Sequence, residues 1–316
     1  MMLDLLAYAA FFLVTALTYG IICLGLNVQW GQTGLFNVGV AGFVAIGAYV
    51  SALLTTPDAA GRFGGFNLPI WLGWIAAMLI SGAVAALIGA ITLRLRADYL
   101  AITTFGIAIA IQLVALNAET VTGGPFGVGF IPRAFGGFED RPVVFNLANL
   151  VLVGAITALL YYGLERLVRS PWGRVLRAIR EDEAAALSLG KNVNLFRIQA
   201  FALGSAIMGL AGAVQAHFIG FIAPENYAST MTFQVWAMLI IGGSGNNRGA
   251  LLGAVLVWGL WSVTGALLAA FVPGEYQART AALQIVLIGV ALAALLVLRP
   301  RGLLGEEKMI SRFLKD

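Results

Sequence analysis

Charged side chains gather in one short stretch of an otherwise apolar sequence, SPWGRVLRAIREDEAAALSLGKN, at residues 170–192. Its charged residues are Arg174, Arg177, Arg180, Glu181, Asp182, Glu183 and Lys191. Such groups form ion pairs and charge-assisted hydrogen bonds with a complementary surface. The chemistry that this stretch supports is therefore recognition of a partner.

Local signals predict that these residues lie on one short helix within 171–190. Ser170 followed by Pro171 is typical of a helix start, and Gly190 with Asn192 is typical of a helix end. One face of this helix would be apolar, formed by Val175, Leu176, Ile179, Ala186 and Leu187. Such a helix suits a groove on another protein. The alternative is a helix that lies on anionic lipid, which three consecutive acids disfavour.

Composition places these elements in a membrane. The chain is 60% hydrophobic and 11% charged, whereas charged residues make up about a quarter of a soluble domain. Apolar runs of the ~20 residues needed to cross a ~30 Å hydrocarbon core recur at 5–26, 34–54, 69–93, 99–117, 147–166, 197–220, 250–271 and 280–298. A further run at 232–241 is too short to cross alone. We therefore predict an all-α, polytopic integral membrane protein with about eight to ten transmembrane helices in a single domain over 1–316.

The loops between these spans fall into two groups by charge. One group holds most of the basic residues and includes a loop at about 167–196 and a C-terminal tail at about 299–316. The other group carries mainly acids, such as Glu139 and Asp140. By the positive-inside rule the first group is cytoplasmic. The charged stretch is then a cytoplasmic loop.

Two glycine-rich polar segments break the apolar pattern at membrane depth, NVQWGQTGLFNVG at 27–39 and IGGSGNNRGA at 241–250. Irregular backbone survives in a bilayer only where protein or a water-filled cavity covers it, and paired interruptions point to a transporter's substrate route. The alternative is a pair of ordinary tight loops. On the first interpretation, we expect the route to be lined by Gln32, Thr33, Asn37, Gln234 and Ser244.

The sequence also excludes several function classes. No Asp, Glu, Lys or Arg lies deep within a span, which disfavours a proton- or ion-coupled pump built on membrane carboxylates. No GxxxxGK[ST] loop is present, so the chain is not itself the usual ATPase, and energy for uphill transport must enter through a partner. We interpret Cys23, the only cysteine, as a packing residue and His217, the only histidine, as an interfacial or packing residue. We therefore expect no catalytic site, no metal and no cofactor bound by this chain.

Four segments carry a resemblance to a known family. They are GLNVQWGQTGLFNVGVAGFVAIGAYVSALL, RLRADYLAITTFGIAIAIQLVALNAETVTGGPFGV, SPWGRVLRAIREDEAAALSLGKNVNLFRIQAFALGSAIMGLAGAVQA and AMLIIGGSGNNRGALLGA. Together they resemble the permease subunits of ABC importers for branched-chain amino acids, most closely those of the LivM type, over about residues 20–305.

The resemblance implies a role for the charged stretch. In such permeases a coupling helix transmits ATP-driven movement from an ATPase to the spans, and Glu183–Ala185 is similar to the family's glutamate-alanine-alanine signature. Gly190 falls one position later than that signature expects. The coupling residues implied are Arg174, Arg177, Arg180, Glu181, Asp182, Glu183 and Gly190.

Partners and location follow from the same resemblance. It implies a second homologous permease, two ATP-binding subunits that hold the ATP, and an extracytoplasmic solute-binding protein. The complex would lie at a bacterial inner membrane, and no nucleic acid is expected as a partner. The turn at 122–125 and the acids Glu139 and Asp140 would face the solute-binding protein.

Three positions depart from the family pattern. Family members commonly carry a histidine or an acid where this chain has Val40, Ile109 and Gln234. The substrate is then a branched-chain amino acid or a similar small polar solute, with urea or a short amide as the alternative. A stand-alone channel or facilitator is a further alternative, because it also needs no membrane carboxylate.

Overall fold

The computed structural model describes residues 2–58, 63–271 and 302–305, with the pairs 283–284, 286–287, 289–290, 293–294 and 297–298. In this part of the chain the structure consists of helices and their connections, so the prediction of an all-α fold is confirmed. The predicted span at 280–298 and the tail at 299–316 lie largely outside the described residues.

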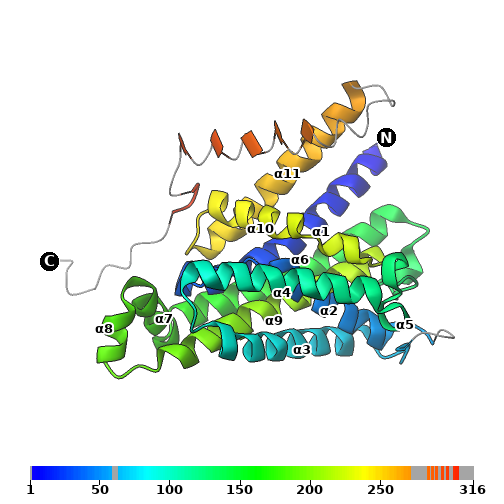
Figure 1. Ribbon diagram of the computed structural model, residues 1–316. Helices are drawn as coiled ribbons and strands as arrows, with labels where there is room; N and C mark the ends of the chain where they lie inside the picture. The colour runs from blue at the N-terminus through cyan, green and yellow to red at the C-terminus, as the bar shows by residue number, and fades with distance from the viewer. Residues whose placement is uncertain are drawn as a thin grey trace.

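Within the described residues, six helices are long and apolar enough to cross a membrane (Figure 1). They are α1 (Met2–Leu26), α3 (Ile70–Thr92), α4 (Ala97–Asn117), α6 (Pro142–Val168), α9 (Val193–Ile219) and α11 (Asn247–Phe271). The chain is therefore a multi-pass membrane protein. Two apolar helices are shorter than the ~20 residues that cross a bilayer, namely α2 (Val40–Thr55) and α10 (Ser229–Gly242).

Each predicted span between residues 5 and 271 overlaps one of these helices over most of its length. The span expected at 34–54 is wrong at its start, since α2 begins only at Val40. Short helices fill the connections: α5 (Glu119–Thr122), η2 (Gly124–Phe126), η3 (Gly136–Phe138), α7 (Pro171–Glu181), α8 (Glu183–Ser188) and η4 (Pro224–Tyr227).

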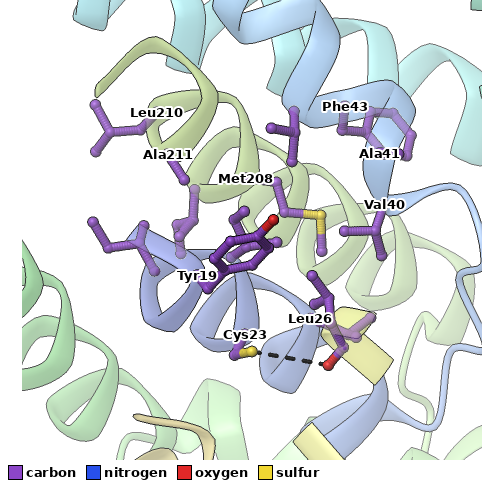
Figure 2. Close-up of a cluster of buried hydrophobic side chains, with 14 of the residues drawn as sticks. Tyr19, Cys23, Leu26, Val40, Ala41, Phe43, Met208, Leu210 and Ala211 are labelled. Atoms are coloured by element: carbon purple, nitrogen blue, oxygen red, sulfur yellow. Dashed lines mark hydrogen bonds between the residues drawn. The ribbon is translucent and has the colours of Figure 1, made fainter. Parts of the chain in front are cut away.

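Helix α9 occupies the centre of the bundle, packed against α1, α2 and α3. Glycines allow this packing, because a side-chain carbon on Gly209 would collide with Ser81 of α3, and one on Gly212 would collide with the Val44 carbonyl of α2. Figure 2 shows the core that results, where Tyr19 of α1 lies beside Met208 of α9. Cys23 is buried there, with its Sγ 3.9 Å from the Val235 carbonyl oxygen.

The two groups of loops lie at opposite ends of this bundle. Figure 1 shows α7 and α8 at one end and α5 at the other. At the α5 end, Phe63 donates to the Thr120 carbonyl and Val128 pairs with Ile222. At the α7 end, Arg248 at the start of α11 donates to the Tyr161 hydroxyl of α6. The separation by charge that the sequence showed is thus a separation in space.

The prediction of one helix within 171–190 is wrong, because the chain breaks at Asp182. This residue adopts an extended backbone (φ −151°, ψ 104°), and its carboxylate accepts a hydrogen bond from the Ala185 N–H at 3.0 Å, which caps α8. Ala186 still packs beside Ile179, but Leu187 turns away and is 54% exposed. The predicted start at Pro171 is confirmed, and Gly190, predicted to mark the helix end, follows the end of α8 with a left-handed backbone (φ 71°). Asn192, predicted to mark the same end, instead caps the following helix α9.

Cysteine scanning tests the orientation of the bundle. We expect cysteine at Glu139 to react with an impermeant maleimide added outside intact cells, and cysteine at Glu183 to react only after permeabilisation. Glu183 begins α8, whereas Glu139 pairs with Arg133, which bonds the Ile219 carbonyl at the opposite end of α9. The positions are matched, since each carboxylate is exposed and pairs with one arginine. Native Cys23 is buried and adds no background. Labelling of the Glu183 position alone from outside would invert the topology.

Candidate functional site

The first interruption begins with a change of helix type at the end of α1. Residues Asn27–Gly31 form one π-helical turn, and the chain then runs without regular structure from Gly34 to Gly39 before α2 starts. Gly34 takes a left-handed backbone (φ 75°), which favours glycine. Single π turns insert an extra residue into a helix and are frequent at functional sites.

The second interruption lies directly against the first. It connects α10 to α11 through two glycines with positive φ, Gly243 (112°) and Gly245 (87°). Gln32 donates from Nε2 to the Gly245 carbonyl at 3.0 Å, and the Gly245 N–H donates to Asn27 Oδ1 at 2.8 Å. The two segments that the sequence paired by their composition are therefore in contact.

The backbone N–H groups at the start of α2 donate to side chains of neighbouring helices. The Val38 N–H donates to Thr104 Oγ1 of α4 at 3.0 Å, and the Ala41 N–H donates to Thr232 Oγ1 of α10 at 3.1 Å. A buried helix end without such partners would be costly in a bilayer. These peptide donors are thus occupied by the chain itself rather than left open for a solute.

Asn37 lies inside the fold. Its side chain is fully buried, donates to Gln29 Oε1 at 2.8 Å and accepts from the Gly39 N–H at 2.7 Å. Its carbonyl accepts from Trp236 Nε1 at 2.9 Å. In this structure Asn37 therefore joins α2 to α1 and α10.

The other residues expected along the route lie around the same contact. Thr33 is buried and donates to the Val28 carbonyl, and Gln32 is 1% exposed. The Gln32 Oε1 atom has no hydrogen-bond partner among the described residues. Gln234 and Ser244 are half-buried. The structure thus gathers these side chains, and only Gln234 and Ser244 of the five reach the surface to an appreciable extent.

A chain of polar side chains that sequence analysis missed leads away from this contact. Asn27 donates to Asn247 at 2.9 Å, Asn247 donates to Glu165 at 3.2 Å, and Glu165 accepts from Arg169 at 2.7 Å. These residues connect the interruptions to the start of the charged loop. The available signal was the presence of Asn27 and Asn247 within the two quoted segments, but their pairing depends on contacts across the chain.

One predicted coupling residue reaches the first interruption directly. Arg180 of α7 donates from Nη1 to the Gly31 carbonyl, and its Cγ would lie 3.1 Å from a side-chain carbon added at Gly34. Arg174 and Arg177 instead donate to backbone carbonyls of their own loop, at Arg169 and Val168. Arg180 is therefore the direct bridge from α7 to the membrane-embedded segment.

The remaining coupling residues lie at or near the exposed surface of α8. Glu183 forms a two-point ion pair with Arg197 of α9, at 2.8 and 2.9 Å. Glu181 and Asp182 are exposed. Beside them lie two exposed leucines, Leu187 and Leu189, the latter 76% exposed. An apolar patch next to acids at the tip of a loop is typical of a protein contact.

His217 makes packing contacts. Its Nδ1 lies 2.6 Å from the Pro132 carbonyl oxygen and its Nε2 lies 2.8 Å from Ser51 Oγ. Both ring nitrogens are therefore occupied within the protein, and the residue is buried rather than interfacial.

Comparisons with known proteins point to a family of transport permeases. The family described as "Branched-chain amino acid transport system / permease component" matches residues 8–296. The high-affinity branched-chain amino acid transport system permease protein LivM of Escherichia coli (strain K12) is 33% identical over 90% of this chain and 67% of its own length. The probable LivM of Methanocaldococcus jannaschii is 31% identical over 93% of this chain and 92% of its own. LivH of Salmonella typhimurium is 26% identical over 92% of each chain. No solved structure matches the chain.

Replacing Asn37 with leucine tests whether the first interruption depends on it. The substitution keeps the size of the side chain but leaves Gln29 and the Gly39 N–H without their partner, at about 1–3 kcal/mol for each buried group. We expect a clearly lower thermal unfolding midpoint for the purified protein. The matched control, Gln234→Leu, removes the same amide from a half-buried position and should shift the midpoint little. Equal midpoints for both variants would contradict the packing role of Asn37.

Proposed function

Since the chain belongs to the family of branched-chain amino acid transport permease components, we propose that it forms one half of the translocation passage of an ATP-driven importer. Its substrate is a branched-chain amino acid or a similar small polar solute. The observation that carries the proposal is the family match across residues 8–296. The contact between the two interruptions at membrane depth supports it, because broken helices mark the substrate region of transporters.

The proposal includes the partners of such an importer. The relatives include both LivM and LivH permease proteins, which favours a second, homologous permease as the other half of the passage. Two ATP-binding subunits hold and hydrolyse the ATP, and an extracytoplasmic solute-binding protein delivers the solute. The complex lies in the bacterial inner membrane.

We propose that α7 passes movement to the interruptions by two routes. The direct route is the hydrogen bond from Arg180 to the Gly31 carbonyl. The indirect route runs from Arg169 through Glu165 and Asn247 to Asn27. Both routes end on the π turn, where an irregular helix bends more easily than a regular one. A shift of the loop would therefore displace both interruptions together, since Asn27 and Gln32 bind Gly245.

The exposed end of the loop is the proposed contact with the ATPase. Leu187 and Leu189 offer apolar surface, and Glu181 and Asp182 add charge beside it. The ion pair between Glu183 and Arg197 holds the start of α8, and with it this surface, against α9. A patch that is apolar at its centre and charged at its edge fits the anatomy of a protein interface.

The passage itself is proposed to lie where this chain meets the second permease. Side chains that line a passage between subunits are at least partly exposed in one subunit alone, which favours Gln234 and Ser244. Gln32, Thr33 and Asn37 then support the lining from within. Neutral amides and hydroxyls bind a polar solute weakly, which suits passage because a tightly held solute would not leave.

Reconstitution tests the proposed function. With both permeases, the ATPase and the binding protein in proteoliposomes, we expect uptake of labelled leucine that requires ATP and the binding protein. Equal flux without ATP would favour a channel or facilitator instead. ATP-driven uptake of urea or acetamide in place of leucine would keep the importer and replace its substrate.

Arg180→Met tests the direct coupling route. Methionine keeps apolar contact over Gly34 but loses the charge-assisted bond to Gly31, which is worth ~1.5–3 kcal/mol. We expect at least about a tenfold fall in leucine uptake per ATP hydrolysed, with the ATPase still bound. Arg174→Met on the same helix is the control, because the Arg174 guanidinium donates to the Arg169 carbonyl within the loop. Uptake per ATP that is equal in the two variants would show that Arg180 does not couple.

A further inference from the structure

A cavity of about 260 Å³ lies at the C-terminal end of α9, the end opposite the α7 loop that precedes this helix. Its walls come from α1, from the last turns of α9 and from residues 221–227. The 221–227 wall is held in place by neighbouring loops: Ile222 and Val128 exchange two backbone hydrogen bonds at 2.8 and 2.9 Å, and Gln112 of α4 donates to the Pro224 carbonyl at 3.2 Å. The cavity is therefore formed before any ligand binds, as small-molecule sites usually are.

Four of the eight residues that line the cavity are polar and uncharged, namely Tyr19, Gln215, Asn226 and Tyr227. Tyrosine hydroxyls and carboxamides both donate and accept hydrogen bonds. Together they can bind a carboxylate and an ammonium group at the same time, without the strong hold that a buried counter-charge would exert.

The other part of the wall is apolar. Ile219, Phe221 and Ile222 line it, and Phe221 and Ile219 are partly exposed while Ile222 is buried. An aliphatic side chain gains free energy by leaving water for such a surface. Urea has no aliphatic group and would use only the polar part.

The polar side of the cavity has unused hydrogen-bonding capacity nearby. The ring of Tyr49 packs edge-on against Tyr227, with centroids 6.1 Å apart. Its buried hydroxyl has no hydrogen-bond partner in the described part of the chain. A buried hydroxyl without a partner is destabilising, and Tyr49 is not itself one of the residues that line the cavity.

We infer that this cavity is a binding site for a small aliphatic amino acid on the extracytoplasmic side of the permease, with the zwitterionic head at Tyr19, Gln215, Asn226 and Tyr227 and the side chain at Ile219, Phe221 and Ile222. The inference rests on the proposed function for the side of the membrane and the direction of transport. It goes beyond that function by selecting an aliphatic amino acid over urea or a short amide.

Protection from thiol labelling tests the site. The complete importer without its binding protein is placed in nanodiscs with Asn226→Cys, and the rate of reaction with a maleimide is measured in leucine or urea. We expect leucine to slow the reaction by a factor of 1 + [leucine]/Kd, about tenfold at ~10 times the Kd, and urea to slow it much less. Phe126→Cys is the control, because Phe126 is 88% exposed at the same end and does not line the cavity.

A second variant tests the polar wall. Tyr227→Phe, combined with Asn226→Cys, keeps the ring contact with Tyr49 but removes one hydroxyl from the cavity. We expect half-maximal protection to need several times more leucine. Equal protection with and without this hydroxyl would remove Tyr227 from the site.

Three results would overturn the inference: no slowing by leucine at the Asn226 position, equal slowing at the Phe126 position, or slowing by urea as strong as by leucine. Leucine uptake measured in parallel separates the two proposals. ATP-dependent uptake without protection would refute the cavity site and leave the importer function standing. Protection without uptake would refute the importer function and leave the site.

Discussion

Every break in a membrane helix frees peptide groups that lipid cannot hydrogen-bond, and this constraint governs the centre of the molecule. Where α1 ends and α2 begins, the freed groups are bound by Asn37, Thr104 and Thr232. Where α10 meets α11, Asn27 and Gln32 bind the backbone of Gly245. The first break therefore supplies the polar side chains that bind the backbone of the second. These bonds place residues more than 200 positions apart in contact.

On the proposed function, the same constraint explains how the charged loop can act on the membrane interior. Side chains that satisfy the interruptions also bind the loop, since Asn27 leads through Asn247 and Glu165 to Arg169. Arg180 adds a direct bond to the Gly31 carbonyl. A polar contact in a low-dielectric interior is costly to break, so the loop and the interruptions tend to move together. The hydrogen bonds that satisfy the freed polar groups thus also connect the loop to the interruptions.

The sequence predicted what depends on local pattern and missed what depends on distant contacts. Apolar runs located α1, α3, α4, α6, α9 and α11, because a span is defined by its own composition. The start of α2 was placed too early, since residues 34–39 are apolar enough for a helix but are held open by hydrogen bonds to α4 and α10. The break at Asp182 was missed because acids were interpreted as surface charge, whereas this carboxylate caps α8. The chain from Asn27 to Arg169 could not be predicted, as nothing local pairs Asn27 with Asn247.

The neutrality of the membrane interior has a consequence for selectivity. A buried charge would bind a zwitterion more strongly than amides and hydroxyls do, but it would raise the cost of inserting its helix and slow release of the solute. Tyr19, Gln215, Asn226 and Tyr227 at the outer cavity and Gln234 and Ser244 near the interruptions are all uncharged. Neutral groups distinguish solutes mainly by shape and apolar contact, where one methylene changes binding by only ~1–3 kcal/mol. On the proposed function, strict discrimination must therefore occur before the solute reaches the permease, at a partner that can bind tightly because it does not have to release the solute into the cell.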